Sequence, residues 1–259
     1  MQVQFHKYHG TGNDFVLIDN RDEILGGTEQ DWFAHLCHRH FGIGADGVIL
    51  LNKHPELDFE MDYFNSDGKR STMCGNGGRC MARFAADLGL VQGQTRFMAI
   101  DGIHEAEILP DRIRLKMILS RDFKQLGENT YYLFTGSPHV VQFIGGNLET
   151  HPVVEEGRKI RENWPNGGTN VNFVTQLEDG SCQVRTYERG VEDETLSCGT
   201  GVTAVAEVMA TKSKINLETV TIHTPGGTLH VKLKPHSEPW LEGPAVSVFT
   251  GIIQGPTRV

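Results

Sequence analysis

The feature that most constrains the fold is an internal duplication centred on two cysteines. Residues 74–77 read Cys-Gly-Asn-Gly, and residues 198–201, at an offset of 124 (198 − 74), read Cys-Gly-Thr-Gly. Tyr63 and Tyr187 each lie 11 residues before the cysteine of their own half. Self-similarity at a fixed offset is typical of a supersecondary unit that occurs twice. The sequence therefore predicts two similar lobes, each with one cysteine at the same point.

Helical and strand patterns follow both cysteine motifs. Apolar residues recur at the spacing of one helix face, first at Met81, Phe84, Ala85 and Leu88, then at Val202, Val205, Ala206 and Met209. Gly89 is the expected C-terminal cap of the first helix. Alternating segments predict strands at Arg96–Ile100, Ile103–Leu109, Arg112–Ile118, Val220–His223 and Thr228–Leu233. A weaker similarity pairs Asn13–Val16 with Val171–Val174.

These patterns predict an α+β fold of two pseudo-symmetric lobes. Each lobe is expected to be a mixed or antiparallel, barrel-like β-sheet around a central helix. The N-terminal lobe, with Cys74, is expected to span residues 1–119 and to include a returning segment, 250–259. The C-terminal lobe, with Cys198, is expected to span residues 120–249. The polar stretch Ser120–Thr130 is the predicted linker.

A cysteine directly before a glycine-rich helix start has a distinctive electrostatic setting. Unpaired backbone N–H groups and the helix dipole favour a thiolate there, and glycines let a ligand carboxylate approach. A cysteine in a folded protein is more often a small core residue, and this role is predicted for Cys37, Cys80 and Cys182. Cys74 and Cys198 recur at the same point of both halves, so they are predicted to be functional.

Two opposed thiols suit a reaction that inverts a stereocentre. One sulfur removes a proton from one face of a carbon, the other delivers a proton to the opposite face, and the reverse reaction exchanges their roles. Backbone N–H donors at two helix starts would stabilise charge that develops on an α-carboxylate. The first Gly-x-Gly lacks the rest of a dinucleotide-binding pattern, so no nucleotide cofactor is expected. No other cofactor and no metal is expected either.

Charge and composition exclude other classes of protein. The chain has 24 basic and 33 acidic side chains, a formal net charge of −9, which argues against nucleic acid or an anionic membrane as a partner. No apolar stretch approaches the roughly 20 residues of a membrane span, and residues 1–7 lack the apolar core of a signal peptide. The odd number of cysteines, five, fits thiols in a reducing compartment, so a cytoplasmic location is expected.

Several motifs, in order along nearly the whole chain, resemble the diaminopimelate epimerase family. They are His9–Phe15, Gly42–Gly47, Asn65–Gly68, Met73–Cys80, Tyr187–Gly190 and Cys198–Gly201. The resemblance implies a pyridoxal-independent enzyme that converts LL-2,6-diaminopimelate to the meso form, in lysine and peptidoglycan biosynthesis. It also implies a small-molecule amino-acid substrate and a cytoplasmic homodimer.

The resemblance also implies roles for individual residues. Cys74 and Cys198 become the acid–base pair, and His139 and Glu188 become the groups that tune their protonation. The residues implied to bind substrate are Asn13, Asn65, Gly75, Asn76, Asn172, Glu188, Arg189, Gly199 and Thr200. Arg189 is expected to hold the distal carboxylate bidentately, which a lysine could not do.

The chain departs from the family pattern at three places. Ser137 precedes Pro138-His139 where the family commonly has asparagine, so a contact there is expected to be lost or bridged by water. Gly47 stands where some members carry glutamine. The loop 191–195 is one residue longer than in some relatives. None of these changes touches the cysteine chemistry.

Four alternatives remain open at this point. The nearest is a cofactor-independent epimerase of the same architecture that acts on proline, hydroxyproline or histidine. Residues 35–40, which contain three histidines and Cys37, could instead bind zinc, although their spacing is unlike that of common zinc modules and Gly42 is the expected cap of that helix. A thiol–disulfide protein would lack the usual Cys-x-x-Cys. A Cys-His hydrolase would leave the duplication unexplained.

Overall fold

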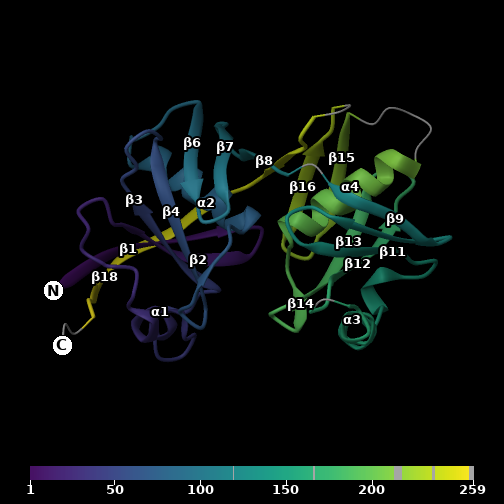
Figure 1. Cartoon of the computed structure of the whole chain (residues 1–259), viewed down its shortest axis with the longest axis horizontal. Helices are drawn as coiled ribbons and strands as arrows, with labels where there is room; N and C mark the ends of the chain where they lie inside the picture. The colour runs from purple at the N-terminus through teal and green to yellow at the C-terminus, as the bar shows by residue number, and fades with distance from the viewer. Residues whose placement is uncertain (119, 166, 213–217, 235–236, 257–259) are drawn as a thin grey trace. The chain divides into compact units, whose positions relative to one another are not determined.

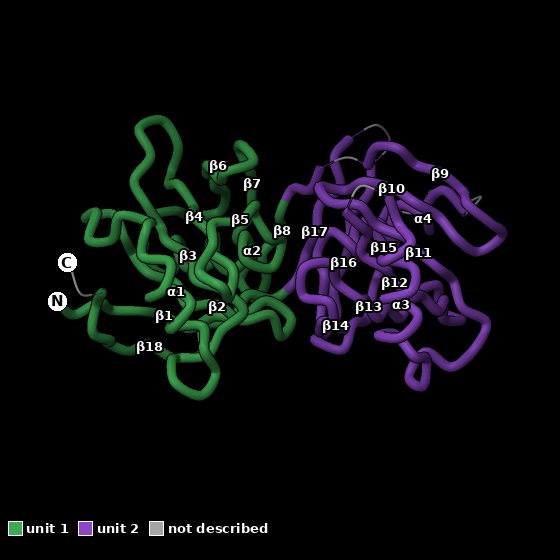
Figure 2. Tube along the Cα trace, turned by 60° about the horizontal axis from the view of Figure 1, so that its bottom comes forward, with its two compact units in different colours: residues 1–115, 244–259 green, residues 116–243 purple. Residues whose placement is uncertain are grey.

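The structure is a computed structural model that describes residues 1–118, 120–165, 167–212, 218–234 and 237–256. The chain forms two compact units (Figure 2), one of Met1–Leu115 with Pro244–Val259 and one of Lys116–Gly243. Residue 119, at the boundary expected from the sequence, and residues 257–259, at the end of the expected returning segment, lie outside the described residues.

The first unit is a mixed sheet with two helices (Figure 1). Its strands are β1 (Gln2–Gly10), β2 (Asn13–Asp19), β3 (Gly47–Asn52), β4 (Phe59–Asn65), β5 (Arg70–Ser71), β6 (Gln94–Ala99), β7 (Gly102–Ile108), β8 (Ile113–Lys116) and β18 (Val246–Gln254). The pairs β1–β18, β1–β2, β3–β4, β4–β5, β6–β7 and β7–β8 are antiparallel, whereas β2–β3 and β4–β6 are parallel. The helices are α1 (Gln30–Cys37) and α2 (Gly75–Asp87).

The second unit repeats this arrangement. Its strands are β9 (Arg121–Gly127), β10 (Thr130–Phe134), β11 (Pro138–Phe143), β12 (Asn170–Gln176), β13 (Cys182–Glu188), β14 (Asp193–Thr195), β15 (Thr219–Thr224), β16 (Gly227–Lys232) and β17 (Trp240–Gly243). Here β11–β12 and β13–β15 are the parallel pairs. Its helices are α3 (Val153–Glu162) and α4 (Gly199–Lys212), with a short 3-10 turn, Leu148–Thr150.

The strand pairings establish which elements correspond between the units. The parallel pair β2–β3 matches β11–β12, and β4, with partners β3, β5 and β6, matches β13, with partners β12, β14 and β15. The predicted similarity of Asn13–Val16 to Val171–Val174 is therefore wrong, because it equates β2 with β12. The strand that corresponds to β2 is β11.

Each unit wraps its sheet around one buried helix. Helix α2 packs on β1, β2, β3 and β7, and α4 packs on β10, β11, β12, β15 and β16. Most side chains of α4 are buried, which fits its apolar composition, since a helix that is apolar all round lies in a core. The predicted α+β fold with a mixed sheet around a central helix is confirmed. None of the described helices has the length and apolar content needed to cross a membrane.

The sequence-based elements are mostly confirmed, with two corrections. Both predicted central helices are present, and Gly89, at φ 73°, follows the C-cap Leu88 of α2. The predicted linker Ser120–Thr130 is wrong, because it forms β9, paired with β10. The expected cap at Gly42 is also wrong, because α1 ends five residues earlier, at Cys37.

Candidate active site

Cys74 and Cys198 occupy equivalent positions at the starts of the two central helices. The Cys74 carbonyl accepts from Gly78 N (2.7 Å), and the Cys198 carbonyl accepts from Val202 N (2.9 Å). The first backbone N–H groups of each helix are thus close to a sulfur, in a region of positive potential. Cys74 is half-buried and Cys198 is only 6% exposed. The predicted position before a helix is confirmed at both sites.

In the first unit, the side chain of Asn13 joins the cysteine to α2. The Asn13 Oδ1 atom accepts from Cys74 Sγ at 3.5 Å and from Asn76 Nδ2 at 3.2 Å. Its Nδ2 atom donates to Asp46 Oδ2 at 2.6 Å. A carboxylate only accepts hydrogen bonds, so Asp46 fixes the orientation of the amide and turns its oxygen toward the sulfur. The structure therefore brings three of the predicted site residues together.

Charged side chains hold Asp46 in place on the other side. Arg39 pairs with Asp46 Oδ1 at 2.7 Å and with Asp14 Oδ1 at 2.8 Å. Lys7, 6% exposed, forms an ion pair with Asp14 at 2.7 Å, and the pKa of Asp14 is lowered by Lys7 and Arg39 against the opposing effect of burial. Asn13 is thus positioned by an ion-pair network that sequence reasoning missed.

Arg79 is a second residue that sequence reasoning missed. Its side chain is fully buried, and its guanidinium donates to Asn76 Oδ1 (2.9 Å), Thr11 Oγ1 (3.4 Å) and Gly75 O (3.4 Å). Among the described residues it has no carboxylate partner, and burial lowers its pKa. The guanidinium fixes the amide of Asn76, whose Nδ2 must then face Asn13. The i, i+3 spacing of Asn76 and Arg79 in a predicted helix is the signal that could have found this contact.

In the second unit, Asn172 orients the buried side chain of His139. The Asn172 amide donates through Nδ2 to Val140 O (3.0 Å) and accepts at Oδ1 from Thr186 Oγ1 (3.0 Å), which fixes its orientation. The same Nδ2 contacts His139 Nδ1 at 3.2 Å, so Nδ1 is the acceptor. A neutral imidazole with an acceptor at Nδ1 carries its proton at Nε2.

The His139 ring donates into a pair of hydroxyl groups. Its Nε2 atom lies 2.8 Å from Ser137 Oγ and 2.9 Å from Thr200 Oγ1, and these two oxygens are 3.3 Å apart. Thr200 Oγ1 lies 3.5 Å from Cys198 Sγ. Ser137 Oγ also accepts from Asn170 Nδ2 at 3.1 Å. Within this unit, His139 thus connects with Cys198 through hydroxyl groups, and Ser137, where the family commonly has asparagine, is part of the connection. The expectations that a contact is lost at Ser137 and that this change does not touch the cysteine chemistry are therefore wrong.

Burial keeps His139 neutral, and this makes the stability of the protein depend on pH. Burial, assisted by the charge of Arg189, lowers the pKa of His139 from 6.5 to about 3. As the pH falls from 6.5 towards 3, the unfolded chain binds a proton that the native state does not. We expect this histidine to reduce the free energy of unfolding by up to about 1.4 kcal/mol per pH unit in that range. Urea unfolding between pH 6 and 4 should show that the free energy of unfolding falls less steeply with pH in His139→Gln than in the wild type. Equal slopes in the two proteins would contradict a neutral, buried His139.

Gly201, the second glycine of the motif, leaves room for the Asn172 amide. A Cβ atom at Gly201 would lie 2.2 Å from Asn172 Oδ1, whereas at the equivalent Gly77 it would lie 3.1 Å from the movable end of Ile49. We expect Gly201→Ala to cost about 2–3 kcal/mol of unfolding free energy, because it displaces a buried amide. Gly77→Ala is the matched control, and its free energy of unfolding is expected to lie within about 1 kcal/mol of the wild-type value. Equal losses in denaturant unfolding would show that the amide can move.

Glu188 and Arg189 lie where β13 ends, close to the His139 cluster. Glu188 Oε2 accepts from Thr195 Oγ1 at 2.9 Å, and Arg189 N donates to Asn170 Oδ1 at 2.9 Å. Arg189 is exposed, and its charge acts on His139. Asn65 ends β4 with an exposed side chain, and Gly199 begins α4. Among the described contacts, the side chains of Asn65, Glu188 and Arg189 form no hydrogen bond to another predicted site residue.

The other departures from the family pattern have local structural causes. A Cβ atom at Gly47 would lie 2.5 Å from the carbonyl oxygen of Phe64, so β4 leaves no room for a side chain. In the loop 191–195, Glu192 adopts φ 60°, pairs with Arg161 and accepts from the Tyr187 hydroxyl. Residues 193–195 of that loop form β14 against β13.

The remaining cysteines lie in the packed core. Cys37, Cys80 and Cys182 are 4% exposed or less, and burial raises the pKa of their thiols to about 12, 12 and 11 respectively. His38, from the segment weighed as a zinc site, uses Nδ1 to accept from the backbone N–H groups of His40 and Phe41. The described residues contain no group of three or more His, Cys, Asp or Glu side chains placed to hold a metal ion.

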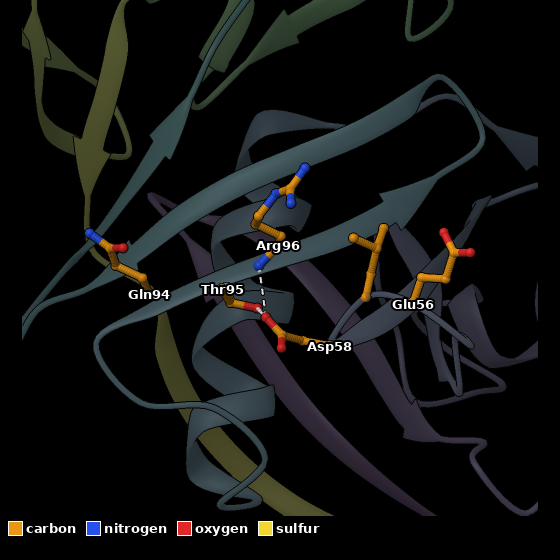
Figure 3. Close-up of a pocket in the computed structure, with 6 residues that line it drawn as sticks. Glu56, Asp58, Gln94, Thr95 and Arg96 are labelled. Atoms are coloured by element: carbon orange, nitrogen blue, oxygen red, sulfur yellow. Dashed lines mark hydrogen bonds between the residues drawn. The ribbon is translucent and has the colours of Figure 1, made fainter.

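A small pocket lies elsewhere on the first unit (Figure 3). It is lined by residues 56–58 and 94–96. Asp58 Oδ2 accepts from Thr95 Oγ1 and from Arg96 N, both at 2.8 Å, and these bonds join the turn before β4 to β6. Because its carboxylate already serves this structural purpose, we assign the pocket no role in catalysis.

Comparison with known proteins agrees with the geometry. A family model described as diaminopimelate epimerase matches residues 5–117 and 131–249. Diaminopimelate epimerase of Flavobacterium psychrophilum is 46% identical over 253 residues (95% of this chain, 98% of that protein), and that of Aquifex aeolicus is 40% identical over 271 residues (96% and 97%). Two solved structures share the fold: a Bacillus anthracis protein of the PhzF family (TM-score 0.77, 15% identity, 98% and 99% covered) and a hydroxyproline epimerase from Agrobacterium vitis (TM-score 0.72, 16% identity, 97% and 92% covered).

Proposed function

Because the chain belongs to the diaminopimelate epimerase family, we propose that it interconverts LL-2,6-diaminopimelate and the meso isomer without a cofactor. The observation that carries this proposal is the pair of cysteines at equivalent helix starts. Each sulfur lies beside backbone N–H groups that can receive a carboxylate. The chemistry requires the two thiols to reach opposite faces of one α-carbon, one as base and one as acid.

The proposed roles follow from the chemistry of each group. Cys74 and Cys198 transfer the protons. The backbone N–H groups of Gly75, Asn76, Gly199 and Thr200 stabilise the charge that develops on the α-carboxylate. Asn13, Asn65, Asn172, Glu188 and Arg189 hold the polar groups of the substrate. His139 acts on Cys198 through hydroxyl groups, and Glu188 is the second group that tunes protonation.

An exchange experiment in heavy water tests both the reaction and the substrate. The protein is incubated with LL-diaminopimelate, proline or histidine, and deuterium at the α-carbon is followed by NMR. Deuterium in diaminopimelate, with formation of the meso isomer, is the expected result. Exchange confined to proline or histidine would instead indicate an epimerase whose substrate has a single amino-acid group. No exchange in any of the three substrates would contradict the proposal.

We propose a cytoplasmic location on chemical grounds. A two-thiol acid–base pair works only while both sulfurs stay reduced, which a glutathione-buffered compartment ensures. The proposed products serve lysine and peptidoglycan synthesis. Oxidation that joins the two sulfurs is expected to abolish activity reversibly, and full activity in fully oxidised, thiol-free protein would contradict the acid–base role.

We also propose that the protein is a homodimer and that β18 contributes to the interface. This strand exposes four large apolar side chains, Val246, Val248, Phe249 and Ile252. Several exposed large apolar side chains on one strand are typical of a protein–protein contact. Sedimentation should give a dimeric mass for the wild type and a monomeric mass for Ile252→Asp. The control Phe41→Asp changes a side chain that is 77% exposed outside β18 and should remain dimeric. A monomeric wild type would refute the dimer.

A further inference from the structure

The two units hold corresponding residues around their cysteines, at the same offset of 124. The pairs are Asn13 and Ser137, Asp46 and Asn170, Asn76 and Thr200, and Cys74 and Cys198. Asn13 begins β2, and Ser137 directly precedes β11. Asp46 directly precedes β3, and Asn170 begins β12. The other two pairs lie at the starts of α2 and α4. The side chains in three of these four pairs differ, so the two hydrogen-bond chains can be compared step by step.

In the first unit, the hydrogen bonds run away from the sulfur. Cys74 donates to Asn13 Oδ1, and Asn13 Nδ2 donates to Asp46 Oδ2. The acceptor at the end of this chain is a carboxylate, which only accepts hydrogen bonds. The amide cannot reverse, because Asn76 Nδ2 also donates to the same Oδ1 atom. The sulfur therefore faces an oxygen lone pair, to which a thiol can donate and which would repel a thiolate.

In the second unit, the hydrogen bonds run towards the sulfur. Asn170 is the donor at the start, because its Nδ2 also donates to Pro138 O (3.0 Å) while its Oδ1 accepts from Arg189 N. Ser137 Oγ accepts this bond, and its own proton is then directed to Thr200 Oγ1. Thr200 in turn is left to donate its proton to Cys198 Sγ.

His139 reinforces this direction in the second unit. Its Nε2–H group points at the Ser137 and Thr200 oxygens, so neither hydroxyl can donate back to the ring. A thiolate accepts a hydrogen bond from a hydroxyl far better than a thiol does, because the bond is then charge-assisted. The cluster therefore favours the anionic form of Cys198.

From these opposite directions we infer that, in the ligand-free protein, Cys198 is the thiolate and Cys74 is the thiol. The residue that sets the direction is Asp46, an acceptor, in one unit and Asn170, a donor, in the other. The inference rests on the proposed acid–base role of both cysteines. In one turnover the α-proton moves to Cys198 Sγ while the Cys74 thiol proton moves to the opposite face of the carbon. The enzyme is left with the reverse protonation, so the free enzyme is ready for only one of the two isomers until its protons redistribute.

Among the charged groups near Cys74, some favour its thiolate and others favour its thiol. The buried Arg79 favours a thiolate, but its N–H groups are taken by the oxygens of Gly75, Thr11, Asn76 and Pro244. Asp46 and Asp14 oppose it, although Arg39 partly neutralises both. Asp101, which accepts from the backbone of Met73, adds negative charge and is paired with His104. The hydrogen bond from the sulfur to Asn13 is the directional contact among these influences.

Charged groups also lie around the cluster that contains Cys198. Arg189 supplies positive charge at the end of β13, and Glu188 beside it accepts from Thr195. Glu207, on the helix that follows the cysteine, is bonded to Ser120, and burial raises its pKa. His139 is neutral, because burial lowers its pKa to about 3, and it contributes its N–H dipole.

The pH dependence of alkylation tests the assignment without any substrate. Ligand-free protein is treated briefly with iodoacetamide between pH 5 and 10, and the modification of each cysteine is quantified by peptide mass spectrometry. The titration midpoint of each rate reports thiolate formation, whereas the access of the reagent to the sulfur changes the maximal rate. The midpoint for Cys198 is expected at least about one pH unit below that for Cys74. Equal midpoints, or a lower one for Cys74, would overturn the inference.

Three variants test the direction of the chains. Thr200→Val removes the last donor and should raise the Cys198 midpoint, while Thr200→Ser keeps the hydroxyl and should leave it near the wild-type value. Asp46→Asn turns the end of the first chain into a possible donor and should lower the Cys74 midpoint. Unchanged midpoints in Thr200→Val and Asp46→Asn would refute the role of these chains. Because no epimerisation is measured, failure here is distinguishable from failure of the proposed function.

Discussion

Replacing either Cys74 or Cys198 with alanine is expected to lower the rate of epimerisation by about 10³-fold or more, whichever isomer is supplied. A positioned acid or base contributes roughly 10²–10⁴ to a rate, and each cysteine has both roles when the forward and reverse reactions are considered. Interconversion of the LL and meso isomers can be followed by NMR. A single variant that still interconverts them at the normal rate would contradict the two-base mechanism.

The same variants should separate proton removal from inversion. A variant with one remaining sulfur can still remove an α-proton from the isomer that presents it on that face. It should therefore catalyse slow deuterium exchange with retention, in one isomer for Cys74→Ala and in the other for Cys198→Ala. Cys182→Ala is the matched control, because that cysteine is buried in β13 and takes no part in the cluster. Its activity should stay close to that of the wild type.

Local patterns were sufficient to predict the two central helices and the hairpins that follow them. The spacing of Met81, Phe84 and Ala85 and the glycine at 89 specify α2 without knowledge of the rest of the chain. The turn at residues 225–227 likewise specifies the hairpin of β15 and β16, whose register pairs Thr224 with Gly227. Such features depend on residues that are close in sequence.

Features that depend on distant residues were not predicted. The strand β9 is exposed at all seven positions, so its sequence has no apolar alternation, and its backbone pairing with β10 is what makes it a strand. The equivalence of β2 with β11 was missed because Asn13 and Ser137 are different residue types, although their offset is that of the two cysteines. The parallel pairs β2–β3 and β11–β12 identify the equivalence only once the fold is known.

The site shows the same division between local and distant information. The cysteine motifs can be found in the sequence because they are repeated. The hydrogen-bond chains that end at the sulfurs combine residues from separate elements. Asp46 and Asn170 look unrelated in the sequence, yet they occupy equivalent places and have opposite hydrogen-bonding character. The sequence could therefore suggest that both cysteines react, but it could not distinguish their protonation states.

Arg189→Met is expected to lower kcat/KM for diaminopimelate by about 10²–10³-fold. The exposed guanidinium has no carboxylate partner among the described residues, and its backbone is held by Asn170. A bidentate grip on a distal carboxylate is worth about 3–4 kcal/mol when one partner is removed, which corresponds to this factor. Arg189→Lys keeps the positive charge but lacks the planar guanidinium. Its kcat/KM should therefore lie between those of the wild type and Arg189→Met.

Lysine provides the decisive comparison for Arg189, because it has the same carbon chain and both amino groups but lacks the distal carboxylate. Any slow α-deuterium exchange that the enzyme catalyses on L-lysine should be nearly the same in the wild type and in Arg189→Met. The variant also loses the charge that helps to lower the pKa of His139, but that effect acts on both ligands alike and cancels in the ratio. Equal losses with diaminopimelate and lysine would mean that Arg189 supports the cysteine chemistry in general. A loss confined to diaminopimelate would show that this side chain selects a substrate with two amino-acid ends.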